Sequence, residues 1–148
     1  MTVYQGTPVP DPDRGGQAFN YFVPIINLAD SSIDYYQPQA YNNWYDGFPG
    51  GSLKYYQDVY LNWRNLEGLS PWGSKPLEGF NGVKSSKLLI GLLASSQAGG
   101  AQYYGPPDVI QQLRSWLAEM AYDLGGFMVW DSHWDKVNNF AISNVCKA

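Results

Sequence analysis

The stretch Gly125-Gly-Phe-Met-Val-Trp-Asp-Ser-His-Trp-Asp135 decides the fold of this chain. Its centre, Phe127-Met-Val129, is a continuous apolar run of the kind found in strands that are covered on both faces. The two glycines before it allow the backbone to enter a strand past close neighbours. We therefore expect a short buried strand over 126–130 that ends in the indole of Trp130, at the strand end where α/β folds bind ligands. A tryptophan that only fills the core is the alternative.

Two more segments are expected to be strands. Residues 33–41 are rich in β-branched and aromatic side chains, and residues 87–95 form a second apolar run. Pro38 lies within the first segment and has no backbone N–H to donate, so it should place this strand at a sheet edge or a bulge. Residues 1–16 contain several prolines and glycines, and we expect them to be irregular.

Apolar residues at three- to four-residue spacing predict helices around these strands. The predicted helices cover 17–28, begun or kinked at Pro24; 52–67, with Ser52 as N-cap; 107 to about 122, with Pro107 in the first turn; and 137–145. Strands that alternate with helices of this length predict a parallel sheet of βα units with right-handed crossovers. Since no linker divides the sequence, residues 1–148 are expected to form one α/β domain.

The composition argues against several classes of partner. The 148 residues carry 13 Asp and Glu against 9 Lys and Arg, for a formal net charge of −4, and no basic cluster occurs. This charge argues against nucleic acid and anionic membranes as main partners. The single cysteine, Cys146, cannot form an internal disulfide. No apolar run approaches the roughly 18 residues of a membrane span, and the first residues lack the pattern of a signal peptide.

The C-terminal ends of the three predicted strands collect polar and aromatic side chains. Strand by strand, they are Gln39, Tyr41 and Asn42; Ser95 and Ser96; and Trp130, Asp131 and His133. Parallel strands bring these ends to one edge of the sheet, and strand alternation puts Gln39 and Tyr41 on the same face. An amide, a phenol and an indole in one pocket suit a neutral ligand with hydroxyl and amide groups and an apolar face. An N-acetyl sugar fits that description.

Three short segments, taken in order, carry a family resemblance. They are Gln39-Ala-Tyr-Asn-Asn43, Leu88-Leu-Ile-Gly-Leu-Leu-Ala-Ser95 and Gly125-Gly-Phe-Met-Val-Trp-Asp131. Together they resemble glycoside hydrolase family 18, the chitinases, and in particular bacterial and plant-type members with a Gln-x-Tyr-Asn strand. The resemblance covers essentially the whole chain. It implies the C-terminal portion of a TIM (β/α)8 barrel, in which the three predicted strands are about strands 6–8.

The resemblance also implies roles for individual residues. Tyr41 would bind the N-acetyl group of the substrate, which is itself the nucleophile and closes to an oxazolinium ion. Gln39 and Asn42 would support the same amide, and Trp130 would form the apolar floor under the reacting sugar. Further candidates for substrate binding are Trp44, Tyr103 and Asp131, the last at a position where the family often has serine. Ordinary loop packing is the alternative for Trp44 and Tyr103.

The sequence departs from the family in the acidic half of the active site. The family's Asp-x-x-Asp-x-Asp-x-Glu motif, which supplies the general acid, does not occur in the 148 residues, and a complete barrel takes roughly 250 residues. Hydrolysis needs a carboxylic acid that protonates the leaving oxygen. We therefore expect this chain to be inactive alone and to be part of a longer, extracellular chitinase acting on β-1,4-linked N-acetylglucosamine polymers. The rival interpretations are a non-catalytic protein that binds chitin or N-acetylglucosamine oligosaccharides, and pairing with the missing barrel half or with a second copy.

The sequence favours no other chemistry. His133 is the single histidine and has no Cys or His partner, so we expect no metal site. A triad of Ser95 or Ser132 with His133 lacks a nucleophile elbow. Gly99-Gly100 is not followed by the Lys-Ser/Thr of a phosphate loop. We expect no cofactor, and the exact glycan, endo- or exo-action and the compartment stay open.

Overall fold

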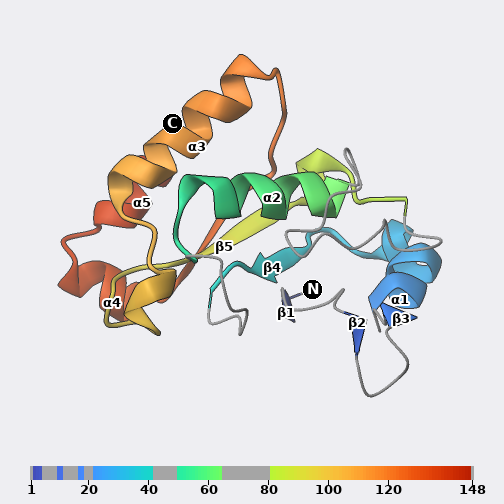
Figure 1. The fold of residues 1–148 in the computed structure, drawn as a ribbon, viewed down its shortest axis with the longest axis horizontal. Coiled ribbons are helices and arrows are strands. Elements are labelled where there is room, and N and C mark those ends of the chain that lie inside the picture. The colour runs from blue at the N-terminus through green and yellow to red at the C-terminus, as the bar shows by residue number, and fades with distance from the viewer. Residues whose placement is uncertain are drawn as a thin grey trace.

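The computed structural model describes residues 2–4, 10–11, 17–18, 22–41, 50–64 and 81–147, with side chains from Ile26 onward. Strands and helices alternate along most of the chain (Figure 1). In order they are β1 (Thr2–Tyr4), β2 (Pro10–Asp11), β3 (Gln17–Ala18), α1 (Phe22–Ala29), β4 (Gln37–Gln39), α2 (Leu53–Arg64), β5 (Leu89–Leu93), α3 (Pro107–Glu119), β6 (Gly126–Trp130), α4 (Ser132–Val137) and α5 (Ala141–Cys146). Short 3-10 turns lie at Asp30–Ser32, Ser85–Lys87 and Ala101–Tyr103.

Four strands form one parallel sheet in the order β1-β4-β5-β6. β5 and β6 pair over their full lengths, from Leu89 with Gly126 to Leu93 with Trp130. β2 and β3 form a separate antiparallel pair. The predicted parallel sheet of βα units is confirmed. β1 is an additional strand within a segment that we expected to be irregular, because three residues next to several prolines give no readable period.

Pro38 lies in an interior strand, and the predicted edge position is wrong. β1 pairs with one side of β4 and β5 with the other. The proline still interrupts the ladder, because Tyr36 N donates to Lys87 O (2.8 Å) and Ala40 N donates to Gly91 O (3.1 Å), while Pro38 between them has no N–H. The strand therefore stays in register although one hydrogen bond to β5 cannot form.

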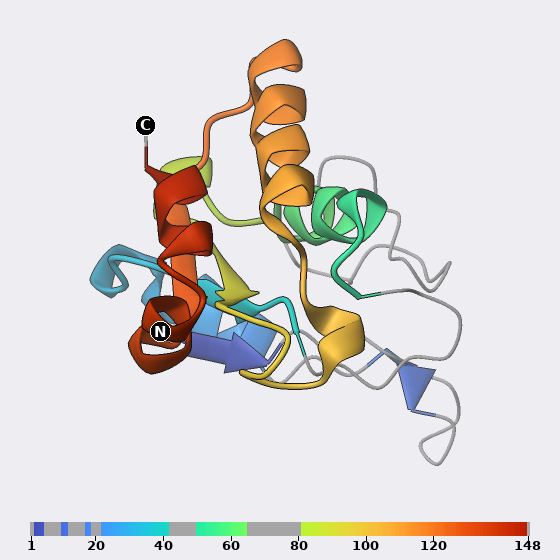
Figure 2. The same cartoon turned by 90° about the vertical axis from the view of Figure 1, so that its left-hand side faces the viewer.

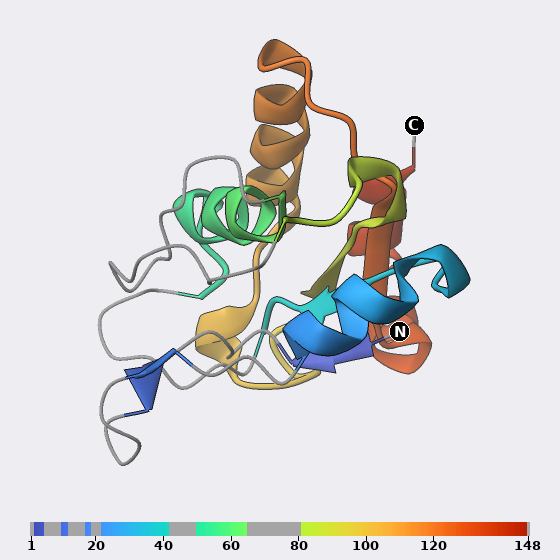
Figure 3. The same ribbon diagram turned by 90° about the vertical axis from the view of Figure 1, so that its right-hand side faces the viewer.

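Helices α1, α2, α3 and α5 contribute to one core cluster with the sheet (Figures 2 and 3). Alternate strand residues Tyr36, Ala40, Leu88, Ile90 and Leu92 are buried in one cluster with helix residues such as Ile26, Tyr56, Val59, Ile110, Leu113 and Ile142. Phe127 and Val129 of β6 pack against the same cluster, but Met128 and Trp130 between and after them do not. This alternation separates a helix-covered face of the sheet from an opposite face, which we call the open face.

Local sequence signals set most helix boundaries. Ser52 Oγ accepts a hydrogen bond from Tyr55 N (3.2 Å), so it caps α2 as predicted. Pro107 is the first residue of α3, also as predicted. α1 begins later than predicted, at Phe22, and Pro24 lies in its first turn, where its missing N–H costs no helical bond. No helix in the described part of the chain is long and apolar enough to cross a membrane.

The C-terminal region contains two short helices, so the single helix predicted over 137–145 is wrong. α4 ends at Val137 and α5 begins at Ala141. Between them Asn139 and Phe140 have φ values of 54° and 57°. An L-residue in this left-handed region cannot continue a right-handed helix, so the chain turns here.

β6 is less buried than predicted. Phe127, Met128 and Val129 are half-buried, and the side chain of Trp130 is 48% exposed. Among the described residues, β6 pairs with β5 alone and forms one edge of the sheet. A continuous apolar run predicts a strand covered on both faces, but it does not say whether a strand lies on both sides of it.

Candidate functional site

The open face of the sheet begins with a row of three paired residues. Gln39 of β4 pairs with Gly91 of β5, and Gly91 pairs with Met128 of β6. A Cβ atom on Gly91 would lie 2.7 Å from Pro38 O and 3.0 Å from Met128 Cε. Glycine therefore allows the methionine side chain and the backbone of β4 to close over the middle strand. Gln39 lies half-buried beside them, on the face that the sequence predicted.

A second row lies one step closer to the C-terminal ends of the strands. Leu93 pairs with Trp130, and Tyr41 follows Gln39 by two residues. Because side chains alternate along a strand, Tyr41, Leu93 and Trp130 share the open face, and we call them the end row. Two strand spacings separate β4 from β6, so the two aromatic residues are about 10 Å apart in the sheet. By strand alternation, Gln39, Tyr41 and Trp130 belong to the same face of the sheet, and their common role in a site remains a prediction.

Tyr41 carries an unused hydrogen-bonding group. Its side chain is 3% exposed, it lies outside the helix-side core, and its Oη has no hydrogen-bond partner among the described residues. Burial raises the pKa of the Tyr41 phenol to about 12, so the hydroxyl is protonated at neutral pH and can donate a hydrogen bond. A buried donor without an acceptor is unfavourable, which makes this oxygen a candidate contact for a ligand.

Trp130 presents an exposed ring at the other end of the end row. The indole is 48% exposed, whereas the backbone is anchored, because Ala94 N donates to Trp130 O (2.8 Å). The peptide bond between Trp130 and Asp131 is cis. A half-exposed indole on a fixed backbone can stack against a flat apolar surface.

Asp131 has a structural task at the start of α4. Its Oδ1 accepts hydrogen bonds from His133 N (2.9 Å) and Trp134 N (3.2 Å), which makes it the N-cap of that helix. Serine and aspartate are both favoured at N-caps. The cap gives Asp131 a structural role, while its contact with substrate remains a prediction.

Tyr103, in the loop that follows β5, packs against the turn before α2. A Cβ atom on Gly50 would lie 2.3 Å from Tyr103 Cδ1, so the ring lies directly over this glycine. Tyr103 O also accepts a hydrogen bond from Tyr56 Oη (3.5 Å). The other two predicted substrate-binding residues, Asn42 and Trp44, lie outside the described residues.

Asn138 is a residue near the site that the sequence analysis missed. Its Nδ2 donates to Ala94 O (2.9 Å) and to Tyr104 Oη (3.1 Å), so it connects the end of α4 to the end of β5. An asparagine within an apparent amphipathic segment gives little signal by itself. Its position just beyond a helix that starts at a strand end was the one available hint.

The described residues offer no alternative catalytic centre. Ser95 Oγ accepts a hydrogen bond from Gln97 N (3.1 Å), whereas His133 packs its ring against Trp134, so each has other contacts. Asp135 is 3% exposed, and its Oδ1 accepts from Ser143 N (3.4 Å), which joins α4 to α5. Groups of three or more potential metal ligands do not occur in the part of the chain that the structure describes.

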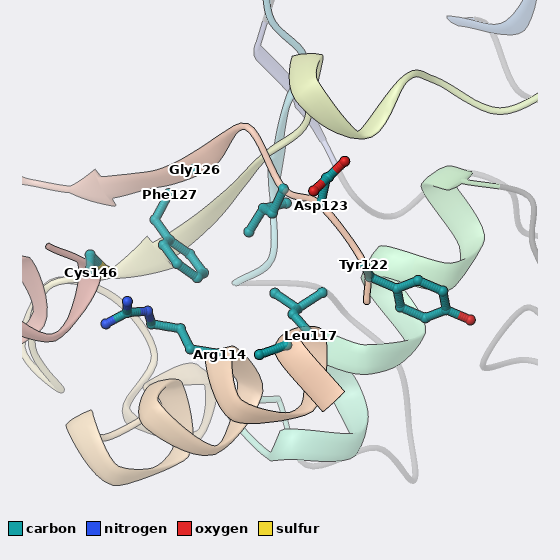
Figure 4. Close-up of a pocket in the computed structure, with 9 residues that line it drawn as sticks. Arg114, Leu117, Tyr122, Asp123, Gly126, Phe127 and Cys146 are labelled. Carbon is teal, nitrogen blue, oxygen red and sulfur yellow. The ribbon is translucent and has the colours of Figure 1, made fainter. Parts of the chain in front are cut away.

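A groove of about 340 Å³ lies at the opposite end of β6 (Figure 4). It is bounded by α3, α5 and the start of β6, and Arg114, Leu117, Tyr122, Phe127 and Cys146 line it. Gly126 begins β6 and Trp130 ends it, so the groove is about 13 Å along the strand from the end row. Burial raises the pKa of the Cys146 thiol to about 11, so it is protonated at neutral pH and unsuited to act as a nucleophile.

Comparisons with known proteins agree with the motif order. No family model matches the chain. In sequence it is 31% identical to Chitinase 3 of Candida albicans over 114 residues, which are 76% of this chain and 17% of that protein. In structure it is similar to a GH18 chitinase from Pseudoalteromonas aurantia, with a TM-score of 0.58 and 19% identity over 95% of this chain and 44% of that one. It is also similar to a chitinase from Aspergillus fumigatus, with a TM-score of 0.50 and 21% identity over 97% of this chain and 46% of that one.

The chain spans less than half the length of these two solved structures and less than a fifth of the Candida relative. Its parallel strands, with helices packed on one face, correspond to part of a (β/α)8 barrel, as expected for a chain that covers less than half of each solved structure. Motifs, sheet and similar proteins agree: the chain resembles glycoside hydrolase family 18 and has the fold of the C-terminal portion of a (β/α)8 barrel.

Proposed function

We propose that this chain forms the aromatic side of a chitinase-type cleft and binds β-1,4-linked N-acetylglucosamine. The observation that carries the proposal is the end row, where an exposed Trp130 indole shares one face with the buried Tyr41 hydroxyl, which has no hydrogen-bond partner in the described part of the chain. A sugar with an N-acetyl group offers a carbonyl oxygen for the phenol and an apolar face for the indole.

The protonation state of Tyr41 suits this role. With its pKa raised to about 12, the phenol keeps its proton and donates to the N-acetyl carbonyl oxygen throughout the neutral range. The same hydrogen bond would hold that oxygen in line for attack on the anomeric carbon in substrate-assisted retaining hydrolysis. Gln39 and Asn42 would assist with the amide, and Trp44, Tyr103 and Asp131 would contact the outer parts of the glycan.

Hydrolysis needs an acid that the proposed site does not supply. The acid motif is absent from the 148 residues, Asp131 caps α4, and Asp135 is buried against α5. We therefore propose that the chain by itself does not hydrolyse chitin oligosaccharides. Turnover of a fluorogenic chitobioside that disappears in Asp131→Asn would contradict this.

Binding of chitotriose to the chain, followed by calorimetry, tests the proposal directly. Cellotriose, which lacks N-acetyl groups, is the matched ligand. We expect binding of chitotriose and little binding of cellotriose. Trp130→Ala should weaken binding by about tenfold or more, since stacked aromatic contacts and burial contribute over 1 kcal/mol. Tyr41→Phe should remove the preference for the N-acetyl sugar.

Tyr35→Ala is the matched control variant. Tyr35 is also 48% exposed, but it precedes β4 at the opposite end of the sheet. It should bind chitotriose like the wild type. Equal affinity for the two trisaccharides, or an unchanged affinity in Trp130→Ala, would exclude the end row as the binding site.

A non-catalytic carbohydrate-binding protein is the second candidate, favoured by the lack of the acid motif. Pairing with the other half of a barrel is supported by β6, whose outer edge has no partner strand among the described residues and can accept one.

Mixing the chain with a family 18 segment that carries the acid motif and the preceding strands distinguishes a binding protein from a barrel half. Recovered hydrolysis would indicate pairing with the other barrel half, and binding without hydrolysis would indicate a binding protein. Dimers in analytical ultracentrifugation would indicate self-association.

A further inference from the structure

The segment from Trp130 to Asn138 closes back on Ala94, the residue that follows β5. Ala94 N donates to Trp130 O (2.8 Å), and Ala94 O accepts from Asn138 Nδ2 (2.9 Å). The two backbone polar groups of Ala94 are therefore bound by the last residue of β6 and by the residue that follows α4. The ends of β5 and β6 are thus connected both by the hydrogen bonds of the sheet and by the Asn138 side chain.

α4 acts as a spacer within this closed loop. Asp131 Oδ1 caps its first turn, and Asn138 N donates to Trp134 O (2.9 Å) at its end. The length of α4 thus sets where the Asn138 amide reaches relative to Trp130. Asn138 Nδ2 also donates to Tyr104 Oη (3.1 Å), so the loop after β5 is attached to the same point.

The chemistry of this contact requires a primary amide. One amide nitrogen carries two hydrogens and can donate one to the Ala94 carbonyl and one to the Tyr104 hydroxyl. The reversed amide would place an oxygen against the Ala94 carbonyl oxygen, where neither atom can donate. An aspartate of the same shape could reproduce the contact with Ala94 only in its protonated form.

We propose that Asn138 is a positioning residue that holds Trp130 in the orientation needed to stack against a sugar. The choice of a sugar as ligand rests on the proposed function, whereas the effect of Asn138 on the order of Trp130 does not. The Trp130 indole is 48% exposed, so about half of it is not covered by the described residues, while the hydrogen bonds through Ala94 and Asn138 hold the backbone that carries it. Order that exists before binding reduces the entropy lost on binding.

The test uses Asn138→Asp over a range of pH. At pH 7 the carboxylate has no proton to donate to Ala94 O, and we expect chitotriose affinity to fall about three- to tenfold, as for one lost hydrogen bond. As pH falls through the range of a carboxyl next to a carbonyl oxygen, about 6 to 4, the protonated side chain should donate again and restore affinity relative to the wild type. Asn138→Ala should not recover.

The second readout needs no ligand. In 19F NMR of fluorotryptophan-labelled protein, with the Trp130 signal assigned by Trp130→Phe, the Trp130 resonance should broaden or split in Asn138→Asp at pH 7 and sharpen at low pH. The titratable groups on α4 and the adjoining loop are Asp131, His133, Asp135, Lys136 and Tyr104. Asn144→Asp, an exposed position on α5, adds the same charge and controls for general effects of pH on them.

The outcomes separate the two proposals. An unchanged Trp130 signal in both Asn138 variants would overturn the inference. A mobile Trp130 with recovery at low pH, in a protein that never binds chitotriose, would support the inference and contradict the proposed function. Asn138→Ser, with one donor, replaces Asn138→Asp if the latter unfolds; a Trp130 signal between those of wild type and Asn138→Ala supports the inference, and a wild-type signal contradicts it.

Discussion

Two tyrosines five residues apart show how differently the two faces of the sheet are completed. Tyr36, on the helix-covered face, is fully buried, and its hydroxyl donates to Asp30 Oδ1 (2.9 Å). Tyr41, on the open face, is 3% exposed, but its hydroxyl has no partner among the described residues. Burial raises the pKa of both phenols, and for Tyr36 the hydrogen bond to Asp30 raises it further. The Tyr36 hydroxyl thus forms a hydrogen bond within the fold, whereas no described residue binds the Tyr41 hydroxyl.

Asp30 is part of the reason for this difference. Lys87 Nζ lies 3.3 Å from Asp30 Oδ1, and the pKa of Asp30 is lowered, first by the hydrogen bond from Tyr36 and then by Lys87. The helix-covered face therefore ends in a satisfied polar network at the N-terminal side of β4 and β5. The open face has its unsatisfied group at the C-terminal side, where parallel sheets bind ligands.

The largest effect should come from the core of the helix-covered face. Ile90 is fully buried between the sheet and the helices, so Ile90→Ala should lower the free energy of unfolding by about 2–5 kcal/mol. Met128, half-buried on the open face, should cost clearly less when changed to alanine. Urea unfolding measures both. Equal losses would mean that the open face carries as much of the core as the helix-covered face.

The two tyrosines should differ in the sign or size of their contribution to stability. Tyr36→Phe removes a hydrogen bond to a carboxylate and should cost about 1.5–3 kcal/mol. Tyr41→Phe removes a buried hydroxyl without a partner and should be neutral or slightly stabilising. Thermal and urea unfolding of the two variants provide the comparison. A loss in Tyr41→Phe as large as in Tyr36→Phe would show that the fold uses the Tyr41 hydroxyl.

Alkaline titration extends the same comparison to the dependence of folding stability on pH. Because the pKa of Tyr41 is about 12 in the folded chain and about 10 in the unfolded chain, its contribution to stability is complete below pH 10 and is lost as pH rises towards 12. Tyr41→Phe should therefore show a shallower fall in stability over this range. An identical alkaline profile would contradict the burial of the phenol.

The smallest effect concerns the helix that follows Trp130. Asp131→Ala removes the N-cap of α4 and should cost about 1 kcal/mol, whereas Asp131→Ser should retain most of that stability. Chemical denaturation measures both variants. If the serine variant loses as much as the alanine variant, the carboxylate charge or a further contact, and not the cap, is what Asp131 contributes.

Much of the architecture could be predicted because its signals are local. The apolar run ending in Trp130 gave β6 with its observed bounds, and Ser52 and Pro107 marked the starts of α2 and α3. Strand alternation placed Gln39 and Tyr41 on one face, because a period of two needs no knowledge of the rest of the chain.

The errors arose where neighbours in space, and not in sequence, decide. Pro38 was expected at a sheet edge or a bulge but lies in an interior strand, since the position of a strand within a sheet depends on which strands flank it. The turn at Asn139 and Phe140 was missed. It is stabilised by a hydrogen bond from Phe140 N to Asp135 O (2.6 Å) in the preceding helix, and no sequence pattern predicts this contact.

The sequence by itself determined the alternation of strands and helices, the residues at the strand ends and the family resemblance, because these follow from periodicity, helix caps and short motifs. Only the tertiary structure decided which of those residues have hydrogen-bonding groups that no described residue contacts. It showed that Tyr41 is buried with no hydrogen-bond partner among the residues that the structure describes, that Asp131 caps a helix, and that Asn138 connects the end of α4 to Ala94 after β5. Whether a polar group is satisfied depends on distances between elements, and these are fixed when the helices and the sheet pack together.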